Sequence, residues 1–193
     1  MIKIIIFDFD RTIGTLVVEW DDWRQDIKKL IQVFDPDTNI ELLDIRHTKQ
    51  NDLIQKYGTE FREQLNQINQ QFELTRVTDF TINKPVLDFI KSTDKELYCW
   101  SSNSRKTLEK YLGEMGIISR FEKIVSRDET YLMKPDNEGF GFIYDPEVSK
   151  EEYLFVGDSE ADKVVAEKSG ITFMHVAYFS KVLTLPHTAG NTI

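Results

Sequence analysis

The feature that most constrains the fold is a short run near the start of the chain, Ile2 to Phe7, in which a single lysine interrupts apolar, mostly β-branched side chains. Such a run is typical of a β-strand that is covered on both faces within a parallel sheet. Similar runs recur, separated by segments with helical spacing, at Glu96–Trp100, Lys123–Ser126, Tyr153–Val156 and Thr172–Ala177. The alternation predicts an α/β domain with a doubly wound parallel sheet.

Residues 15–80 break this alternation, because their apolar residues recur at helical spacing. The expected helices lie around Trp23–Phe34, Asn39–Tyr57 and Thr59–Leu74. Asp21 and Asp22 are candidates to cap the first helix, and Gly58 to end the second. We therefore predict a small all-α domain inserted after the first strand, with the domains divided into a core of residues 1–14 and 81–193 and an insertion of residues 15–80.

Composition excludes several classes of protein. The 33 acidic and 24 basic residues give a formal net charge of −9, so no nucleic-acid partner is expected, although a local basic pocket could still bind one phosphate. The only cysteine, Cys99, lies in an apolar run and is expected to be a buried, reduced core residue. The apolar N-terminal run is too short for a signal peptide or a membrane span, so we expect a cytoplasmic protein without a membrane partner.

Two carboxylates, Asp8 and Asp10, follow the first predicted strand in the sequence Asp8-Phe9-Asp10-Arg11-Thr12. Ligands of open parallel sheets bind at the carboxyl ends of the strands, so this position favours a reaction site. Alternate residues of an extended segment also point to the same side. The structural alternative is a pair of acidic residues that cap a turn.

A second acidic pair follows the apolar run Tyr153–Val156. Gly157 permits a sharp turn there, and Asp158 and Asp162 could reach one cation. The alternative is a helix cap followed by the polar face of a helix.

Two further segments could bind an anion. Ser101-Ser102-Asn103-Ser104 follows a predicted strand and opens a helix, and a hydroxyl beside free N–H groups at a helix start is an anion site. Ser and Asn are also ordinary helix caps. Lys134 could hold a phosphate oxygen, with Pro135 as the first residue of a helix, although a surface lysine is the default for such a residue.

These segments occur in the order Asp8/Asp10, Ser102, Lys134, Asp158/Asp162. The ordered set closely resembles the haloacid dehalogenase superfamily, whose motifs are D-x-D-x-T, a strand-end Ser or Thr, a Lys, and an acidic pair such as G-D-x-x-x-D. The insertion looks like the helical cap that this family carries after its first motif. The resemblance implies a Rossmann-like core and Mg²⁺-dependent hydrolysis of a small phosphorylated metabolite through an aspartyl phosphate.

By this resemblance Asp8 is the nucleophile and Asp10 the general acid and base, whose backbone carbonyl also binds Mg²⁺. Asp158 is a carboxylate ligand of the metal, and Asp162 supports Asp158 or a metal-bound water. The metal site that the resemblance implies comprises Asp8, Asp10, Asp158 and Asp162.

The resemblance also assigns phosphate binding to Ser102, Asn103 and Lys134. Ser101 is a second candidate for the hydroxyl, and Ser102 is preferred because Asn103 follows it as in many members. The sequence departs from the family at Arg11, where glycine is frequent.

Other functions remain as alternatives. Asp10 argues against a dehalogenase, which is not expected to carry a second aspartate here. A phosphosugar mutase would use the same aspartyl phosphate, and a catalytically weak binding module would use only the fold. Candidate substrate contacts from the insertion are Arg24, Arg46 and Arg62.

Overall fold

The computed structural model describes residues 1–43, 45 and 49–184, and their contacts divide the chain into two compact units. One contains residues 1–16 together with the chain from residue 80 onward, and the other contains residues 17–79. Within the described ranges, none of the helices has the length and apolar character needed to cross a membrane.

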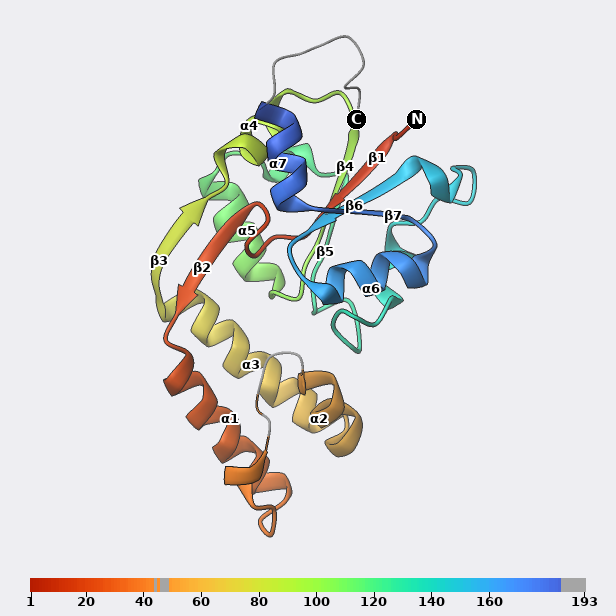
Figure 1. Ribbon diagram of the computed structural model, residues 1–193. Helices are drawn as coiled ribbons and strands as arrows, with labels where there is room; N and C mark the ends of the chain where they lie inside the picture. Colours follow the sequence, from red (N-terminus) through yellow and green to blue (C-terminus); the bar gives the residue numbers. More distant parts are fainter. Residues whose placement is uncertain (44, 46–48, 185–193) are drawn as a thin grey trace. The chain divides into compact units, whose positions relative to one another are not determined.

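A five-stranded parallel sheet forms the centre of the first unit, in the order β5-β4-β1-β6-β7 (Figure 1). Its strands are β1 (Ile4–Phe7), β4 (Glu96–Trp100), β5 (Lys123–Val125), β6 (Tyr153–Gly157) and β7 (Thr172–His175). The chain starts in the middle, builds outward through β4 and β5, then returns to the other side of β1 for β6 and β7. The predicted doubly wound α/β core is confirmed, and the strand order reverses between β1 and β6.

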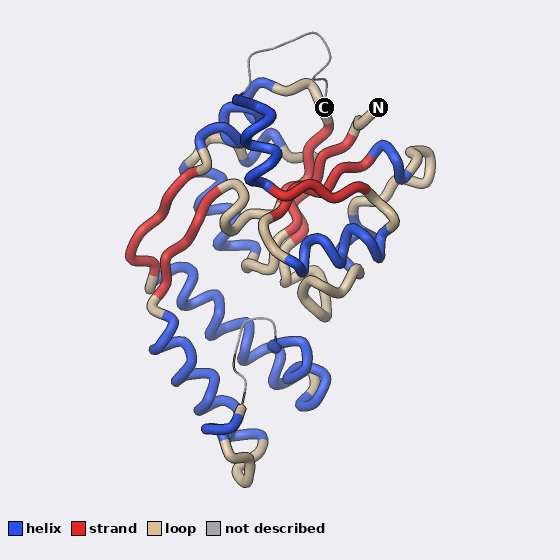
Figure 2. The backbone as a smooth tube through the Cα atoms, viewed as in Figure 1, coloured by secondary structure: helices blue, strands red, loops and turns tan. Residues whose placement is uncertain are grey.

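Helices cover both faces of this sheet (Figure 2). On one face α4 (Lys84–Ser92) and α7 (Val176–Thr184) contribute Phe89 and Phe179, whose ring centroids lie 6.3 and 5.6 Å from that of Phe7. On the other face Ile4 and Ile6 belong to the same buried cluster as Val165 and Ala166 of α6 (Glu160–Ser169). The remaining α-helix of this unit, α5 (Arg105–Glu114), follows β4. Burial on both faces explains why β1 is entirely apolar.

The second unit consists mainly of helices: α1 (Trp20–Phe34), the 3₁₀ turn η1 (Ile40–Leu42), α2 (Gln50–Tyr57) and α3 (Thr59–Thr75). Its apolar side chains pack on one another, and Phe61 lies 5.3 Å from Phe34 and 5.0 Å from Tyr57 between ring centroids. A two-stranded sheet of β2 (Gly14–Val18) and β3 (Val77–Ile82), which the sequence does not predict, stands where the chain leaves and re-enters the first unit.

The first and third predicted helices of the insertion are present, but the prediction of one helix around Asn39–Tyr57 is wrong. The Asn39 side chain accepts a hydrogen bond from the Glu41 N–H at 3.2 Å and so begins a tight turn, after which Leu43 is extended. The α-helix starts only at Gln50. The α1 helix begins at Trp20, so Asp21 and Asp22 lie in its first turn, where they complement the helix dipole instead of capping it.

Two expectations for the core also need correction. The predicted strand Thr172–Ala177 ends at His175, because Val176 and the buried Phe179 belong to α7. Pro135 does not begin a helix, and the next helical element is the 3₁₀ segment η4 (Glu138–Phe142). The glycines at positions 139 and 141 disfavour an α-helix there.

Candidate active site

Asp8 is the first residue after β1, at the point where the strand order reverses. Its N–H donates to the Val156 carbonyl at 2.9 Å, which continues the ladder between β1 and β6 by one residue. Asp158 follows β6 directly. Neighbouring parallel strands therefore bring both carboxylates to the same edge of the sheet, where open α/β sheets bind their ligands.

Asp162 joins them from the first turn of α6, so that Asp8, Asp158 and Asp162 each offer a carboxylate oxygen within 4.8 Å of the others. Ser159 fixes Asp162 through a capping box: its N–H and Oγ donate to Asp162 Oδ2 at 3.1 and 2.7 Å, and its Oγ accepts from the Asp162 N–H at 3.2 Å. A Cβ at Gly157 would lie 2.6 Å from the Asp162 carboxylate, so glycine is needed for this close approach.

Lys134 binds two of these acids. Its Nζ donates to Asp8 Oδ1 at 2.7 Å and to Asp162 Oδ1 at 2.5 Å, and its side chain is only 5% exposed. The ammonium also lies 5.3 Å from the centroid of the Phe155 ring. Lys134 is therefore a buried member of the site rather than the surface lysine that is the default for such a residue.

Burial and charge shift the pKa values of these groups in different directions. Burial raises the pKa of Asp8 above its usual range, and the Asp162 carboxylate adds to this while Lys134 opposes it. Burial also raises the pKa of Asp158, again with the help of Asp162. Burial alone would raise the pKa of Asp162 as well, but Lys134 and the Ser159 hydrogen bonds lower it. For Lys134, the two carboxylates outweigh burial and raise the pKa of the ammonium.

The donor set suits a hard divalent cation. Carboxylate oxygens are the ligands that Mg²⁺ prefers, and three of them converge from two strand ends and one helix start. Both oxygens of Asp162 already accept hydrogen bonds, from Lys134 and Ser159. Asp8 and Asp158 are thus better suited to hold a cation directly, while Asp162 is better suited to support them.

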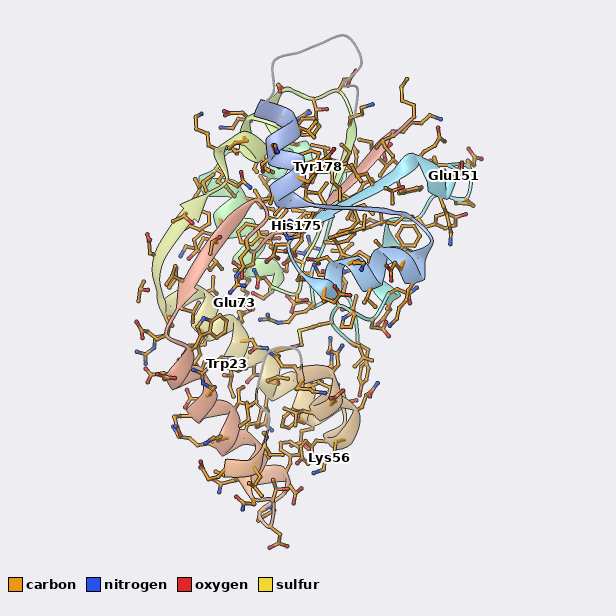
Figure 3. All side chains as sticks on the ribbon, in the orientation of Figure 1. Trp23, Lys56, Glu73, Glu151, His175 and Tyr178 are labelled. Carbon is orange, nitrogen blue, oxygen red and sulfur yellow. The ribbon has the colours of Figure 1, made fainter. Side chains whose placement is uncertain are left out.

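Asp10 lies in the turn that connects β1 to β2. It is half-buried, and its Oδ1 accepts a hydrogen bond from the Leu16 N–H at 3.0 Å, so the backbone of β2 orients the carboxylate. Arg11 is exposed and adopts the left-handed conformation, with φ at 59°, where glycine has no steric penalty. Burial and Asp162 raise the pKa of Asp158, and the Arg11, Lys134 and His175 side chains only partly oppose this rise. His175 lies where β7 passes into α7 (Figure 3).

Residues 101–104, called the Ser102 loop below, connect β4 to α5. The loop lies at the end of β4, which pairs with β1 on the side opposite β6. Ser101 is buried, and its Oγ accepts from the Asn103 N–H at 3.2 Å, whereas Ser102 is partly exposed. The Nδ2 of Asn103 is a buried donor with no hydrogen-bond partner among the described residues. These contacts favour a structural role for Ser101 and leave Ser102 and Asn103 as candidates to bind a ligand.

The structure thus brings Asp8, Lys134, Asp158 and Asp162 into one cluster and places Ser102 and Asn103 at the adjacent strand end. Sequence reasoning missed Ser159, although the spacing of Ser159 and Asp162 is that of a capping box. It also missed Arg127, whose Nη1 donates to the Ser102 carbonyl at 2.9 Å.

Two of the candidate substrate contacts, Arg24 and Arg62, belong to the other unit. Arg24 pairs with Asp21 at 2.6 Å on the exposed face of α1, and Arg62 lies on α3. Arg46 is outside the described residues.

Comparison with known families identifies one match: the sequence model of the haloacid dehalogenase-like hydrolases fits residues 5–176. Comparison with curated protein sequences gives no significant match.

The solved structures with a similar fold include the following three. The candidate HAD hydrolase YfnB of Bacillus subtilis, bound to magnesium, is 18% identical with a TM-score of 0.52, over 97% of this chain and 90% of that one. A predicted phosphoglycolate phosphatase from Haemophilus somnus is 21% identical with a TM-score of 0.55, over 89% and 84%. A candidate β-phosphoglucomutase from Thermotoga maritima is 15% identical with a TM-score of 0.56, over 94% and 98%.

Proposed function

Since this chain belongs to the haloacid dehalogenase-like hydrolases, we propose that it is a phosphatase that hydrolyses a small phosphate monoester through an aspartyl phosphate on Asp8. The observation that carries the proposal is the position of Asp8: at the strand end where the sheet order reverses, within 4.8 Å of two further carboxylates and bonded to a buried lysine. The similarity in fold to a predicted phosphoglycolate phosphatase supports the same class of reaction.

In the proposed reaction an oxygen of the Asp8 carboxylate attacks the phosphorus of the monoester, and the bond from phosphorus to the ester oxygen breaks. Asp10, oriented by the Leu16 N–H, donates a proton to the departing alkoxide. A water molecule then attacks the phosphorus of the aspartyl phosphate and gives a proton to Asp10, while the bond from phosphorus to the Asp8 oxygen breaks. Inorganic phosphate leaves, and both aspartates regain their starting states.

Binding of the phosphoryl group is assigned to Lys134, Ser102 and Asn103, which offer an ammonium, a hydroxyl and a buried amide donor. Asp8 and Asp158 would hold Mg²⁺, which when bound would neutralise charge on the transferring group. The Asp10 backbone carbonyl is proposed as a further ligand, and Asp162 as the support for Asp158. We propose the helical insertion, residues 15–80, as the cap that selects the substrate.

Two substitutions test the assignment of the first motif, with an aryl phosphate as substrate and Mg²⁺ present. We expect Asp8→Asn to abolish turnover and to leave no phosphate on the protein, because an amide oxygen is a poor nucleophile. We expect Asp10→Asn to slow hydrolysis of the intermediate more than its formation, because an aryl oxide leaves without much protonation. Acid quenching of Asp10→Asn with labelled substrate should therefore trap phosphate, and peptide mapping should locate it on Asp8.

Asp88→Asn is the matched control, because Asp88 pairs with Lys84 on the surface of α4 and should leave turnover unchanged. Near-normal turnover by Asp8→Asn, or label on a serine or histidine, would overturn the proposal. Transfer of the label to a second hydroxyl of a sugar phosphate, in place of water, would identify the mutase alternative.

A further inference from the structure

Arg127 has the largest fully buried side chain among the described residues, with 1% of its surface exposed. It lies two residues after β5, at the same edge of the sheet as the Ser102 loop, because Val125 of β5 pairs with Trp100 of β4. A guanidinium remains charged when buried, so its burial is unfavourable unless its N–H groups find acceptors. The acceptors that Arg127 finds therefore indicate its role.

Residue 127 holds two successive carbonyl groups of the Ser102 loop. Its Nη1 donates to the Ser102 carbonyl at 2.9 Å, and its backbone N–H donates to the Asn103 carbonyl at 3.2 Å. Each peptide group is planar, so fixing a carbonyl also fixes the N–H of the next residue. The backbone from which the Ser102 hydroxyl and the buried, unpartnered Asn103 Nδ2 project is thus held by residue 127.

The residues that follow Arg127 bind Arg105, which begins α5 directly after the Ser102 loop. Glu129 accepts hydrogen bonds from the Ser126 N–H and hydroxyl at 2.6 and 2.7 Å and pairs with Arg105 at 2.8 Å. Asp128 accepts from the N–H of Arg105, the first residue of α5, at 2.8 Å. The segment that leads toward Lys134 is therefore tied to both ends of the Ser102 loop.

We propose that Arg127 is a positioning residue for phosphate binding: it holds the Ser102 and Asn103 carbonyls so that the hydroxyl and the amide face the phosphoryl group. It would act through these two carbonyls. This inference rests on the proposed function, since it assumes that Ser102 and Asn103 bind phosphate.

The test compares Arg127→Lys and Arg127→Met with the wild type. Lysine keeps the charge but loses the planar fork, and methionine keeps only part of the bulk. We expect the dissociation constant for inorganic phosphate, measured by ³¹P NMR, and the KM for an aryl phosphate each to rise about tenfold in Arg127→Met and less in Arg127→Lys. The Mg²⁺ affinity should stay within about twofold of the wild type, because the contacts by which Arg127 is proposed to act are to carbonyls of the Ser102 loop.

Arg120→Met is the matched control. Arg120 also donates to backbone carbonyls, Ile90 at 2.9 Å and Thr93 at 2.5 Å, but these lie at the end of α4. This variant should lose stability without any change in phosphate affinity. Equal loss of phosphate affinity in the Arg120 and Arg127 variants would overturn the inference, because a general loss of rigidity would then explain both.

A double-mutant cycle that uses only Arg127→Lys and Ser102→Ala tests the inference even if Arg127→Met fails to fold. If Arg127 acts through the Ser102 loop, Arg127→Lys should weaken phosphate binding much less in a Ser102→Ala background than in the wild type. Additive effects would refute the inference. If the wild type bound phosphate but did not hydrolyse the ester, the proposed function would be overturned instead. The double-mutant cycle could still be interpreted, because it measures phosphate binding and not hydrolysis.

Discussion

Replacement of Lys134 by methionine should destabilise the sheet unit strongly when no metal is bound. The lysine ammonium bridges Asp8 and Asp162 and is 5% exposed, so methionine replaces its aliphatic part but removes its charge. Asp8, Asp158 and Asp162 would then remain within 4.8 Å of one another without the cation that now separates two of them.

The magnitude follows from two estimates that agree. Removing one partner of a buried ion pair costs about 3–5 kcal/mol, because the other charge remains buried and unpaired. Two carboxylates 4.8 Å apart repel each other by about 3 kcal/mol at an effective dielectric constant of about 20. A domain of this size loses about 2–4 °C of melting temperature per kcal/mol, so a fall of about 10 °C is expected.

The assay is urea unfolding in the presence of a chelator, with hydrogen exchange at the amides of β1 and β6 to follow the sheet unit separately from the helical unit. Lys84→Met is the matched control, since Lys84 forms an exposed pair with Asp88 at 2.9 Å, which is expected to contribute only about 0.3–0.5 kcal/mol. Added Mg²⁺ should restore more stability to Lys134→Met than to the wild type, because the variant site carries one more negative charge.

The pH dependence gives a second check on the same variant. Burial raises the pKa of Asp8 in the folded protein above its unfolded value, so its contribution is fully favourable below that unfolded value and is lost as pH rises through the folded pKa. Lys134 lowers the pKa of Asp8, so its removal raises this pKa further. The loss of unfolding free energy in Lys134→Met should therefore be smaller at pH 7 than at pH 9, because Asp8 of the wild type ionises around its folded pKa of about 8 while that of the variant stays protonated. The charge argument would be refuted if Lys134→Met lost less than about 1 kcal/mol of unfolding free energy at pH 8, because breaking a buried ion pair should destabilise the protein by more than that. A loss that is independent of pH would also refute it.

Five further substitutions, at four positions, test single features of the site. Arg11→Gly should raise the free energy of unfolding by about 1 kcal/mol in a urea titration, because glycine adopts the left-handed conformation without strain, and Arg11→Val should lower it. Gly157→Ala should weaken Mg²⁺ binding in a calorimetric titration, because its Cβ would displace Asp162, and an unchanged affinity would contradict this. Asp158→Asn should raise the Mg²⁺ concentration for half-maximal activity about 100-fold, and Asp162→Asn should raise it about tenfold. The effect at Asp162 is smaller because its two oxygens already accept hydrogen bonds from Lys134 and Ser159. A larger effect at Asp162 than at Asp158 would contradict this assignment.

The centre of the sheet was predictable from the sequence because β1 and β6 are buried on both faces. Such strands are continuously apolar, and the prediction of Glu96–Trp100 agrees with β4 residue for residue. The ribbon of β2 and β3 was not predictable, because most of β3 is exposed and carries no apolar run. The boundary between β7 and α7 was also hidden, since one apolar run supplies the end of a strand and the start of a helix.

Within the site, the sequence predicts those residues that directly follow a strand, such as Asp8 and Asp158. Lys134 was weak as a sequence signal, and only the tertiary structure reveals its burial against two aspartates. Arg127 gave no signal, because the run Arg127-Asp128-Glu129 has the composition of an exposed loop. Groups that act through other residues are found by their contacts, and contacts between distant segments leave no local pattern.

For the proposed reaction on a phosphate monoester, the charges of the cluster favour the presence of both a lysine and a divalent cation. Three carboxylates and one ammonium carry a formal charge of −2 when all are ionised, in a site where burial already raises the pKa values of Asp8 and Asp158. A dianionic phosphate monoester would be repelled by that charge, and Asp8 could not approach its phosphorus. Lys134 alone offsets one carboxylate, whereas a divalent cation would offset the other two. The site therefore favours binding of the metal before the monoester, and by linkage the monoester should in turn tighten binding of the metal.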